Sequence, residues 1–245
     1  MWFKSFIKWF FWVVLTLVLG PVVAIAAVFN KRASFHVSRF WARLLLKCAG
    51  IKVTVTGGEN IPPYPSVYAS NHQSYVDVVA LIAYFPRNLT FVAKKTLLVL
   101  PGLNLAMSAQ RHIFVSRGKP SKALRVLRRR GIAAIGNGEN ILIFPTGERS
   151  KDNEVGKFKS GAVALAVWAG APLIPIGIGG SREVLPRGNW PLKSGNVIIS
   201  IGKPISVTVS SLKQKNEITQ KLQGEVENLK RKAEETLIEI PRVSL

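Results

Sequence analysis

The sequence predicts an α/β protein with a layered mixed sheet flanked by helices and an N-terminal membrane-associated helical segment. Short apolar runs alternate with longer helical stretches, which favours a layered domain whose strands are at least partly parallel. A chain of 245 residues that is 48% hydrophobic suffices for one sizeable core. Ahead of the alternation lies a segment without a charge, residues 9–29. Together these observations predict an anchored single domain.

Residues 9–29 are long enough to cross a bilayer, because about 20 helical residues match a hydrocarbon core of about 30 Å. Three interpretations stay open: a spanning helix, a re-entrant or half-inserted hairpin, and a cleaved signal peptide. The length of the segment and its run of Trp and Phe argue against a buried core helix. Gly20-Pro21 near its middle favours a kink or turn. Lysine and arginine flank both ends, so their distribution defines no inside and outside.

Residues 35–48 are predicted to form the next helix. Arg39, Arg43 and Lys47 recur at helical spacing, and apolar residues occupy the remaining surface. After a membrane segment, this pattern favours a helix in the plane of the lipid headgroups. An ordinary surface helix packed on the core is the alternative.

The rest of the chain alternates between predicted strands and predicted helices. The predicted strands are residues 53–56, 66–70, 89–92, 141–144, 173–178 and 197–201, several of them apolar throughout as buried strands are. The predicted helices are residues 76–84, 121–135, 160–169 and about 212–237. We find no internal repeat.

The chain is strongly basic, with 34 Lys and Arg against 13 Asp and Glu and a formal net charge of +21. Anionic partners are therefore expected: nucleic acid, anionic lipid or phosphorylated small molecules. The most basic helix, residues 121–131, lacks interleaved stacking aromatics and any known nucleic-acid module, so we do not predict nucleic-acid binding. On an anchored chain it is expected to attract anionic lipid, at roughly 1 kcal/mol per charge.

Cysteine and histidine usage argues against disulfides and metals. Cys48 is the single cysteine, so no intrachain disulfide can form, which fits a reducing compartment. His36, His72 and His112 show none of the spacings typical of metal ligands. We predict no metal site.

The stretch SNHQSYVDVVAL, residues 70–81, places His72 between a predicted strand and a predicted helix. Asp77 follows five residues later, and on one straight helix such a spacing separates side chains by about 140°. The two can meet only if His72 lies in the turn and Asp77 in the first helical turn. Such a pair can take a proton from a hydroxyl, with the carboxylate holding the imidazole. The alternative is that both residues merely cap the turn and the helix.

A second polar turn, FPTGERS at residues 144–150, follows another predicted strand. It places Glu148 beside Arg149, after a Pro-Thr-Gly turn that can aim side chains into a cleft. From the residues alone, this acid and base either hold a ligand or hold each other.

NHQSYVD, residues 71–77, resembles the first block of the glycerolipid acyltransferases, the family of 1-acylglycerol-3-phosphate (lysophosphatidic acid) acyltransferases, whose hallmark is His-x4-Asp. Later stretches resemble the following blocks in family order: FVAKKTL, HIFVSRGKP, ILIFPTGERS, GKFKSGAVALA and PLIPIGIGGSREVLPRG. The resemblance covers residues 53–205, and blocks in order are more specific than any one of them.

The resemblance implies the glycerolipid acyltransferase fold and a reaction without a covalent acyl-enzyme. A fatty acyl group would pass from acyl-CoA or acyl-ACP, the thioester of acyl carrier protein, to the free sn-2 hydroxyl of 1-acylglycerol-3-phosphate, giving phosphatidic acid. It makes His72 the general base and Asp77 the residue that orients it. Phosphate-binding roles fall on Arg149, Gly147, Arg117 and Lys94.

The resemblance also implies partners and a location. The substrates are a lysophospholipid and an acyl thioester, with acyl carrier protein as a further partner, and no cofactor is needed besides the donor. Residues 1–50 are assigned to membrane-anchoring helices and residues 51–245 to an acyltransferase catalytic domain. The implied location is the membrane, at the cytoplasmic face of a bacterial-type inner membrane.

The chain departs from the family in the second turn. The usual order is Phe-Pro-Glu-Gly-Thr-Arg, whereas residues 144–149 read Phe-Pro-Thr-Gly-Glu-Arg. Either Glu148 occupies part of the Arg149 fork, or it turns away and Thr146 donates its hydroxyl, so both stay candidates for the acceptor site. An acyltransferase for a different lysolipid is therefore an alternative. Ser116 is a smaller departure, where many relatives carry Asp.

Two other classes of protein are alternatives to an acyltransferase. A non-catalytic lipid-binding protein on the same fold would not need the His72 and Asp77 pair. A hydrolase of lipid esters is disfavoured because the chain contains no Gly-x-Ser-x-Gly stretch to carry a serine nucleophile.

Overall fold

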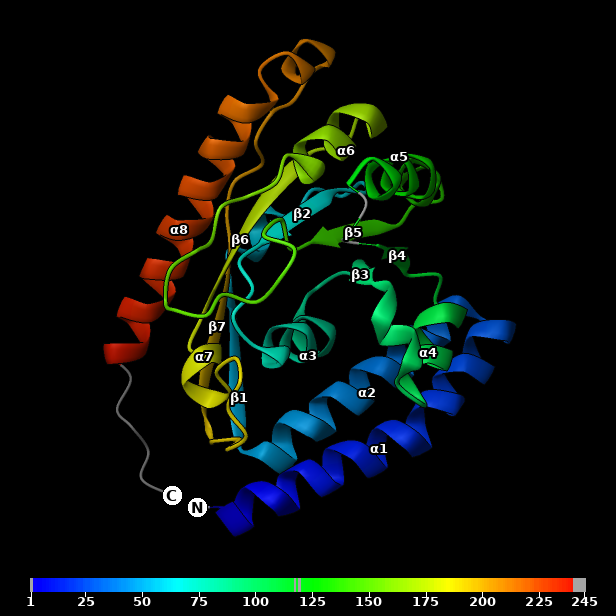
Figure 1. Cartoon of the computed structure of the whole chain (residues 1–245), viewed down its shortest axis with the longest axis vertical. Helices are drawn as coiled ribbons and strands as arrows, with labels where there is room; N and C mark the ends of the chain where they lie inside the picture. Colours follow the sequence, from blue (N-terminus) through cyan, green and yellow to red (C-terminus); the bar gives the residue numbers. More distant parts are fainter. Residues whose placement is uncertain (1, 117, 119, 240–245) are drawn as a thin grey trace.

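A seven-stranded sheet crosses the part of the chain that the computed structural model describes, residues 2–116, 118 and 120–239, and helices cover both of its faces (Figure 1). The strands are β1 (Ile51–Thr56), β2 (Val67–Ser70), β3 (Leu89–Lys94), β4 (Ile113–Val115), β5 (Asn140–Ile143), β6 (Leu173–Gly179) and β7 (Gly195–Ile201). The helices are α1 (Trp2–Phe29), α2 (Lys31–Ala49), α3 (Tyr75–Tyr84), α4 (Leu103–Ala109), α5 (Pro120–Gly136), α6 (Gly161–Ala169), α7 (Ser181–Val184) and α8 (Lys215–Glu239). Short 3₁₀ turns are η1 (Gly58–Asn60), η2 (Lys95–Val99) and η3 (Val209–Leu212).

The sheet is mixed, as predicted. Its order is β1-β7-β6-β2-β5-β3-β4, with β6 and β7 antiparallel and the other neighbours parallel. The carboxyl ends of β6, β2, β5, β3 and β4 therefore lie along one edge of the sheet. In such sheets ligands bind at this edge, so it is the first place to look for a site.

Side chains that alternate along the strands pack against a layer of helices on each face of the sheet. On β5, Leu142 belongs to the core shared with α1, α2 and α3, whereas Ile141 and Ile143 belong to the core shared with α5, α6 and α8. The strand period of two produces this division. On the second face α8 lies close to β6 because Gly177 has no side chain: a Cβ there would lie 2.3 Å from the backbone nitrogen of Lys230.

The predicted strands and helices are confirmed, with shifts at their ends. The terminal helix runs from Lys215 to Glu239, and the first helix begins at Trp2. Strand β4 and helices α4 and α7 were not predicted. With three residues, β4 is too short to show an alternation, and it forms because β3 offers it an edge for pairing.

No turn forms at Gly20-Pro21, because α1 continues as one helix through Pro21, and the alternative of a kink stays a prediction. Gly20 serves close packing instead. A Cβ on Gly20 would lie 2.4 Å from the carbonyl oxygen of Gly102, and one on Gly102 would lie 2.6 Å from the carbonyl oxygen of Thr16. The backbone of α1 thus touches the turn that begins α4, and a side chain at either glycine would separate them.

Helix α1 leaves a large apolar surface uncovered. Among the described residues it is the one helix long and apolar enough to cross a membrane, and 17% of its most apolar window is buried. This low burial excludes an ordinary core helix. Its exposed apolar residues are Trp2, Phe3, Phe6, Ile7, Phe10, Phe11, Val13, Val14, Leu17, Val18, Val22, Ile25, Val28 and Phe29.

Helix α2 packs on the core, as the packed-helix alternative expects, and its position in the plane of the lipid headgroups stays a prediction. It lies between α1 and α3 and buries Ala42, Leu45 and Leu46. Arg39 donates to the carbonyl oxygen of Phe85 (3.0 Å) and Arg43 to that of Ala83 (3.2 Å), which cap the end of α3. Because α1 and α2 share a core with the sheet, the domain boundary at residue 50 stays a prediction.

Candidate active site

Most of the predicted site residues lie on loops at the carboxyl edge of the sheet. His72 follows β2, residues 146–149 follow β5, and Lys94 is the exposed last residue of β3. Strand β5 lies between β2 and β3, so these loops are neighbours. Arg117 follows β4 in sequence but lies outside the described residues.

His72 and Asp77 contact each other, as the spacing predicted. The distance between His72 Nδ1 and Asp77 Oδ2 is 2.8 Å. His72 lies in the turn after β2, and Asp77 is the third residue of α3. Ser74 begins that helix with a capping box, in which the Asp77 carboxylate accepts from the Ser74 amide. The sequence SNHQSYVD therefore starts the helix and joins the pair in one local structure.

The surroundings of Asp77 define which nitrogen of His72 is free. Asp77 is fully buried, and its Oδ2 also accepts hydrogen bonds from the amides of Gln73 (2.8 Å) and Ser74 (2.9 Å). Because this oxygen already accepts from two amides, its contact with His72 is a hydrogen bond when Nδ1 is the donor. In that tautomer Nε2 keeps a free lone pair. The His72 side chain is 12% exposed, which leaves it an opening to a substrate.

Three neighbours fix the histidine turn, and sequence reasoning did not assign them. Phe144 stacks on the His72 ring, with centroids 4.1 Å apart and planes at 17°. The buried amide of Asn71 exchanges two 2.8 Å hydrogen bonds with the backbone of Ile178, which ties β2 to β6. The Ser150 amide donates to the His72 carbonyl oxygen (2.8 Å). Asn71 and Phe144 each adjoin a predicted motif residue, which is the signal that could have found them.

The other two histidines have different surroundings. His112 is buried, and its Nδ1 accepts a hydrogen bond from the Phe91 amide (3.1 Å). Burial, followed by the nearby charge of Lys31, lowers the pKa of His112 to about 3. His36 is exposed on α2. His72 is therefore the histidine that combines a carboxylate partner with partial exposure.

The turn after β5 is held by its own backbone. Gly147 has a φ of +79°, and its amide donates to the Phe144 carbonyl oxygen (3.0 Å). The Thr146 hydroxyl donates to the carbonyl oxygen of Glu148 (2.7 Å). Lys159 joins the turn from the segment before α6, because its amide donates to Pro145 (3.1 Å) and its Nζ would lie 3.2 Å from a Cβ on Gly147. Sequence reasoning missed Lys159, although the block GKFKSGAVALA contains it.

Glu148 turns away from Arg149. Its Oε2 lies 3.1 Å from Nη2 of Arg187, on the connection between α7 and β7, whereas the Arg149 guanidinium lies 3.8 Å from the ring centroid of Tyr75. The first half of the second alternative is therefore seen, while donation by Thr146 to an acceptor stays a prediction. The Thr146 hydroxyl is satisfied within the turn. Arg187 was not predicted, because it lies 39 residues from Glu148.

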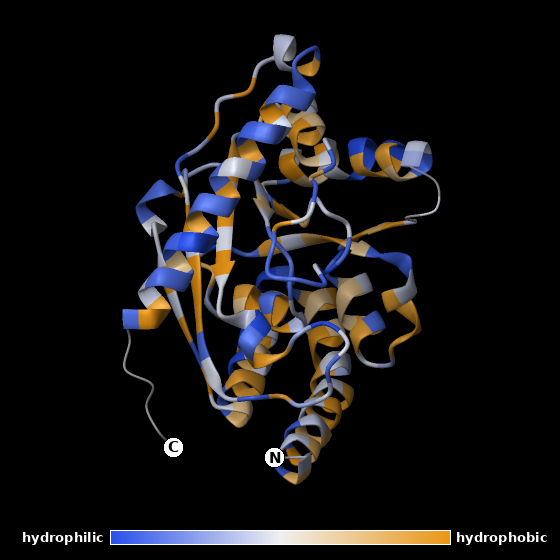
Figure 2. Ribbon diagram, turned by 60° about the vertical axis from the view of Figure 1, so that its left-hand side comes forward, coloured by the Kyte–Doolittle hydropathy of each residue, from blue (hydrophilic) through white to orange (hydrophobic). Residues whose placement is uncertain are grey.

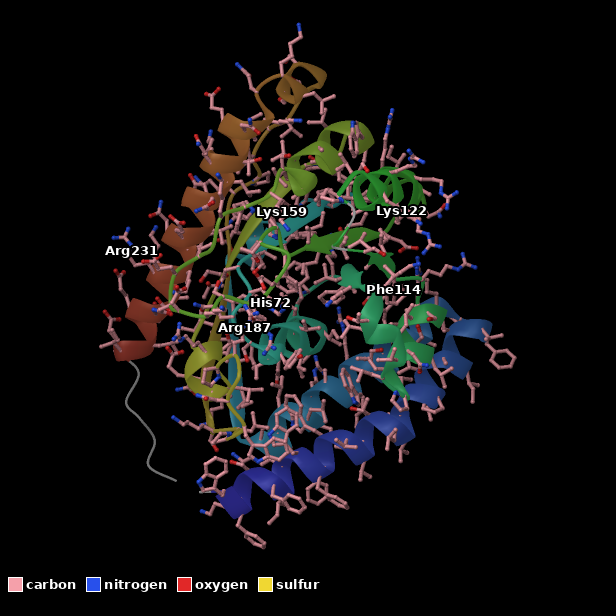
Figure 3. The ribbon with its side chains drawn as sticks, in the orientation of Figure 1. His72, Phe114, Lys122, Lys159, Arg187 and Arg231 are labelled. Atoms are coloured by element: carbon pink, nitrogen blue, oxygen red, sulfur yellow. The ribbon has the colours of Figure 1, made fainter. Side chains whose placement is uncertain are left out.

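These loops converge on one place. Figure 3 labels His72, Lys159 and Arg187, which come from three separate connections, and each bonds to a residue between Pro145 and Ser150. The result is a histidine with a carboxylate partner near several cations, an arrangement that can attract an anion. Among the described residues, no group of His, Cys, Asp or Glu side chains could hold a metal ion.

Comparison with known proteins identifies the family of the chain. The family model described as Acyltransferase matches residues 52–179, so the chain belongs to this family. Its relatives include the 1-acyl-sn-glycerol-3-phosphate acyltransferase of Pseudomonas aeruginosa, which is 34% identical over 196 residues, with 79% of this chain and 74% of that protein covered. The chloroplast 1-acyl-sn-glycerol-3-phosphate acyltransferase LPAT1 of Arabidopsis thaliana is 31% identical over 198 residues, which cover 80% of this chain and 55% of that protein.

The fold is also that of a solved structure. The crystal structure of the 1-acyl-sn-glycerophosphate (LPA) acyltransferase PlsC from Thermotoga maritima superposes with a TM-score of 0.78 and 22% identity, covering 98% of this chain and 97% of that one. The chain spans a little over half the length of the plant relatives it matches.

Proposed function

We propose that the chain is a 1-acylglycerol-3-phosphate O-acyltransferase, which moves a fatty acyl group from an acyl thioester to the free sn-2 hydroxyl of the acceptor and forms phosphatidic acid. The observation that carries the proposal is the 2.8 Å contact between His72 and buried Asp77, beside the arginine-bearing turn at the carboxyl edge of the sheet. The names of the relatives add support, because several are enzymes of this activity.

In the proposed mechanism His72 Nε2 takes the proton of the acceptor hydroxyl as its oxygen attacks the thioester carbonyl. The imidazolium that forms is stabilised by the Asp77 carboxylate, which also holds the ring in place. Collapse of the tetrahedral intermediate breaks the carbon–sulfur bond, and the thiolate receives the proton from His72. The acyl group passes directly to the acceptor, so no covalent acyl-enzyme is needed.

The acceptor's phosphate is proposed to bind beside the turn after β5. Arg149 presents a guanidinium fork that Glu148 leaves free, and the Gly147 turn and Lys159 adjoin it. Lys94 and Arg117 are proposed as further cations, since they end or follow strands at the same edge. Thr146 and Glu148 shape the turn in this proposal. The donor is acyl-CoA or acyl-ACP, and acyl carrier protein remains a proposed partner.

We propose that α1 anchors the protein by lying along one leaflet. Its polar contacts hold it to the catalytic layer: Lys8 Nζ donates to the Ala49 carbonyl oxygen (2.8 Å), Trp9 Nε1 to that of Trp190 (2.8 Å), and Thr16 contacts Trp41 (3.3 Å). A helix held along its length in this way presents one face to lipid. The proposed location is the cytoplasmic face of a bacterial-type inner membrane. Helix α5 packs on the opposite face of the sheet, so its affinity for anionic lipid stays a separate prediction.

An acyl-transfer assay tests the proposal. The full chain in detergent micelles is mixed with labelled acyl-CoA or acyl-ACP and a panel of lysolipids, and phosphatidic acid is the expected product from lysophosphatidate. We expect His72→Ala to lower kcat by about 10² to 10⁴, the range of general-base catalysis. His36→Ala, a change at an exposed histidine of α2, is the matched control. Release of free fatty acid, or no transfer to any acceptor by the unaltered protein, would refute the proposed function.

A further inference from the structure

Arg187 joins two loops at the carboxyl edge of the sheet. Its Nη2 lies 3.1 Å from Glu148 Oε2, and its Nη1 donates to the carbonyl oxygen of Arg149. The Arg187 side chain is 30% exposed and that of Glu148 is 64% exposed. One guanidinium from the connection between α7 and β7 therefore binds two consecutive residues of the turn after β5.

The same turn presents Arg149 in a different direction. Its guanidinium lies over the ring of Tyr75, the first residue of α3. Tyr75 follows Ser74, which caps α3 and contacts Asp77. Arg149 is thus placed toward the histidine turn, while its neighbour Glu148 is placed toward Arg187. The chain separates an acid and a base that adjoin each other in sequence.

This separation matters because a carboxylate and a phosphate compete for the same guanidinium fork. Glu148 is one residue from Arg149, and its charge also repels a phosphomonoester, which carries up to two negative charges. A free Glu148 would therefore weaken acceptor binding in two ways. A cation that engages the carboxylate elsewhere removes both effects.

We propose that Arg187 is a positioning residue that holds the Glu148 carboxylate away from the acceptor's phosphate site and so makes Arg149 available. The proposal rests on the proposed function, because it concerns the lysophosphatidate acceptor of the same site. It identifies the Arg187 and Glu148 pair as a determinant of acceptor binding that accompanies the exchanged Thr-Gly-Glu order. Acceptors without a phosphomonoester are expected to be less sensitive to the pair.

The charge effect can be separated from a merely structural role. Arg187 also bonds to the Arg149 backbone, so its removal loosens the turn as well. A loosened turn would be equally harmful whether residue 148 is charged or neutral. A charge effect, by contrast, disappears when Glu148 is already neutral. A double-mutant cycle therefore distinguishes the two roles, because only a charge effect makes the change of KM depend on residue 148.

The experiment measures KM and kcat for lysophosphatidate with Arg187→Gln, Glu148→Gln, the double variant and Arg187→Lys. We expect Arg187→Gln to raise KM about five- to twentyfold with little change in kcat, because an unpaired charge near the phosphate weakens binding. In the Glu148→Gln background the same change should alter KM by less than about twofold. Arg187→Lys keeps the charge but loses the two-pronged geometry, so it should raise KM by less than Arg187→Gln does.

Lys193→Gln, an exposed lysine of the same connection, is the control and should leave KM unchanged. A monoacylglycerol acceptor, which lacks the phosphate, should show a smaller response to Arg187→Gln. The proposal is overturned if Arg187→Gln keeps the KM of the unaltered protein, or if it changes KM equally with and without Glu148→Gln. The proposed function is judged separately, by acyl transfer in the unaltered protein. If Arg187→Gln does not fold, Arg187→Lys is measured with and without Glu148→Gln, and an equal change of KM in both backgrounds overturns the proposal.

Discussion

At the scale of single residues, Asp77 combines a structural and a proposed chemical task. Its Oδ2 accepts from the amides of Gln73 and Ser74, which begin α3, and from the ring of His72. The helix start and the histidine are therefore held by one atom. A rigid backbone turn, rather than a flexible side chain, sets the position of the proposed base.

Asp77→Asn tests this coupling. We expect kcat to fall by at least about 100-fold, because a neutral amide cannot stabilise the imidazolium that forms on His72 as the carboxylate does. The amide oxygen can still accept from the helix amides, so the protein should fold. Single-turnover acyl transfer measures the loss, and circular dichroism checks the helix content. An unchanged kcat in the folded variant would argue against His72 as the base.

The sequence predicts the local part of the site better than the distant part. The contact of His72 with Asp77 follows from a spacing of five and a strand-to-helix turn. The partner of Glu148 could not be predicted, because Arg187 is brought near by the order of β6 and β7 in the sheet. The approach of Lys159 to Gly147 is also non-local, because the connection from β5 to α6 folds back on itself.

At the scale of elements, the glycines of α1 and α4 decide how closely two segments approach. Gly20→Ala should destabilise the packing of α1 on α4, since the new Cβ would lie 2.4 Å from the Gly102 carbonyl oxygen and the backbone on both sides must move. A loss of roughly 1–3 kcal/mol is typical of such overpacking. The unfolding midpoint in detergent, followed by circular dichroism, measures it.

Gly224 in α8 provides the matched control for this prediction. It also lies inside a helix, but nothing lies within 4 Å of an added Cβ. Gly224→Ala should therefore stabilise the protein by about 0.5–1 kcal/mol, the ordinary preference of a helix for alanine. Equal effects of the two changes would show that helix propensity, and not the contact with Gly102, controls the stability at Gly20.

Helix and strand periodicity predicts most elements, and the exceptions have physical reasons. A solvated Gly-Pro pair is typical of a turn. In α1 the helix continues, and Gly20 allows a close contact with the backbone of Gly102. Residues 35–48 show a basic stripe that is also typical of an interfacial helix, and only the position of α3 reveals that Arg39 and Arg43 cap its end. In both cases the residues contact a segment that is distant in sequence, and the local pattern cannot show this contact.

At the scale of the whole molecule, the apolar surface and the basic helix lie on different faces of the sheet. Helix α1 packs with α2 on the face that carries α3, whereas α5 packs with α6 on the other face. Figure 2 shows hydrophobic residues along α1, and the alternating colours of α8 are those of an amphipathic helix. Helix α1 also contacts α4, which follows the carboxyl end of β3, so a bilayer on α1 would lie near that edge of the sheet.

This arrangement predicts the effect of removing apolar side chains from α1. Phe3, Phe6 and Phe10 are all more than half exposed and recur along one side of the helix. Their triple substitution by Ser should lower binding to phospholipid vesicles at least about tenfold, because each buried aromatic side chain contributes roughly 1.5–3 kcal/mol. Co-sedimentation with vesicles measures the binding, while acyl transfer to a micellar acceptor should persist.

The control for this prediction changes exposed apolar residues elsewhere. Leu124→Ser with Ile132→Ser alters α5, where both side chains are partly exposed. We expect vesicle binding by this variant to remain within about twofold of the unaltered protein. Comparable losses in the two variants would contradict an anchor confined to α1.

The pairing of β1 with β7 bears on how the molecule folds. Ile51 faces Gly195, and Lys8 of α1 bonds near the same place to the Leu192 carbonyl oxygen (3.2 Å). Contacts between segments so far apart in sequence form slowly, because a long loop must close before they gain anything. Until β7 arrives, both edges of β1 are unpaired and Lys8 of α1 lacks one of its partners. Early attachment of α1 to a bilayer would hold these segments apart from other chains. The anchor would then also protect the chain from aggregation while the distant contacts form.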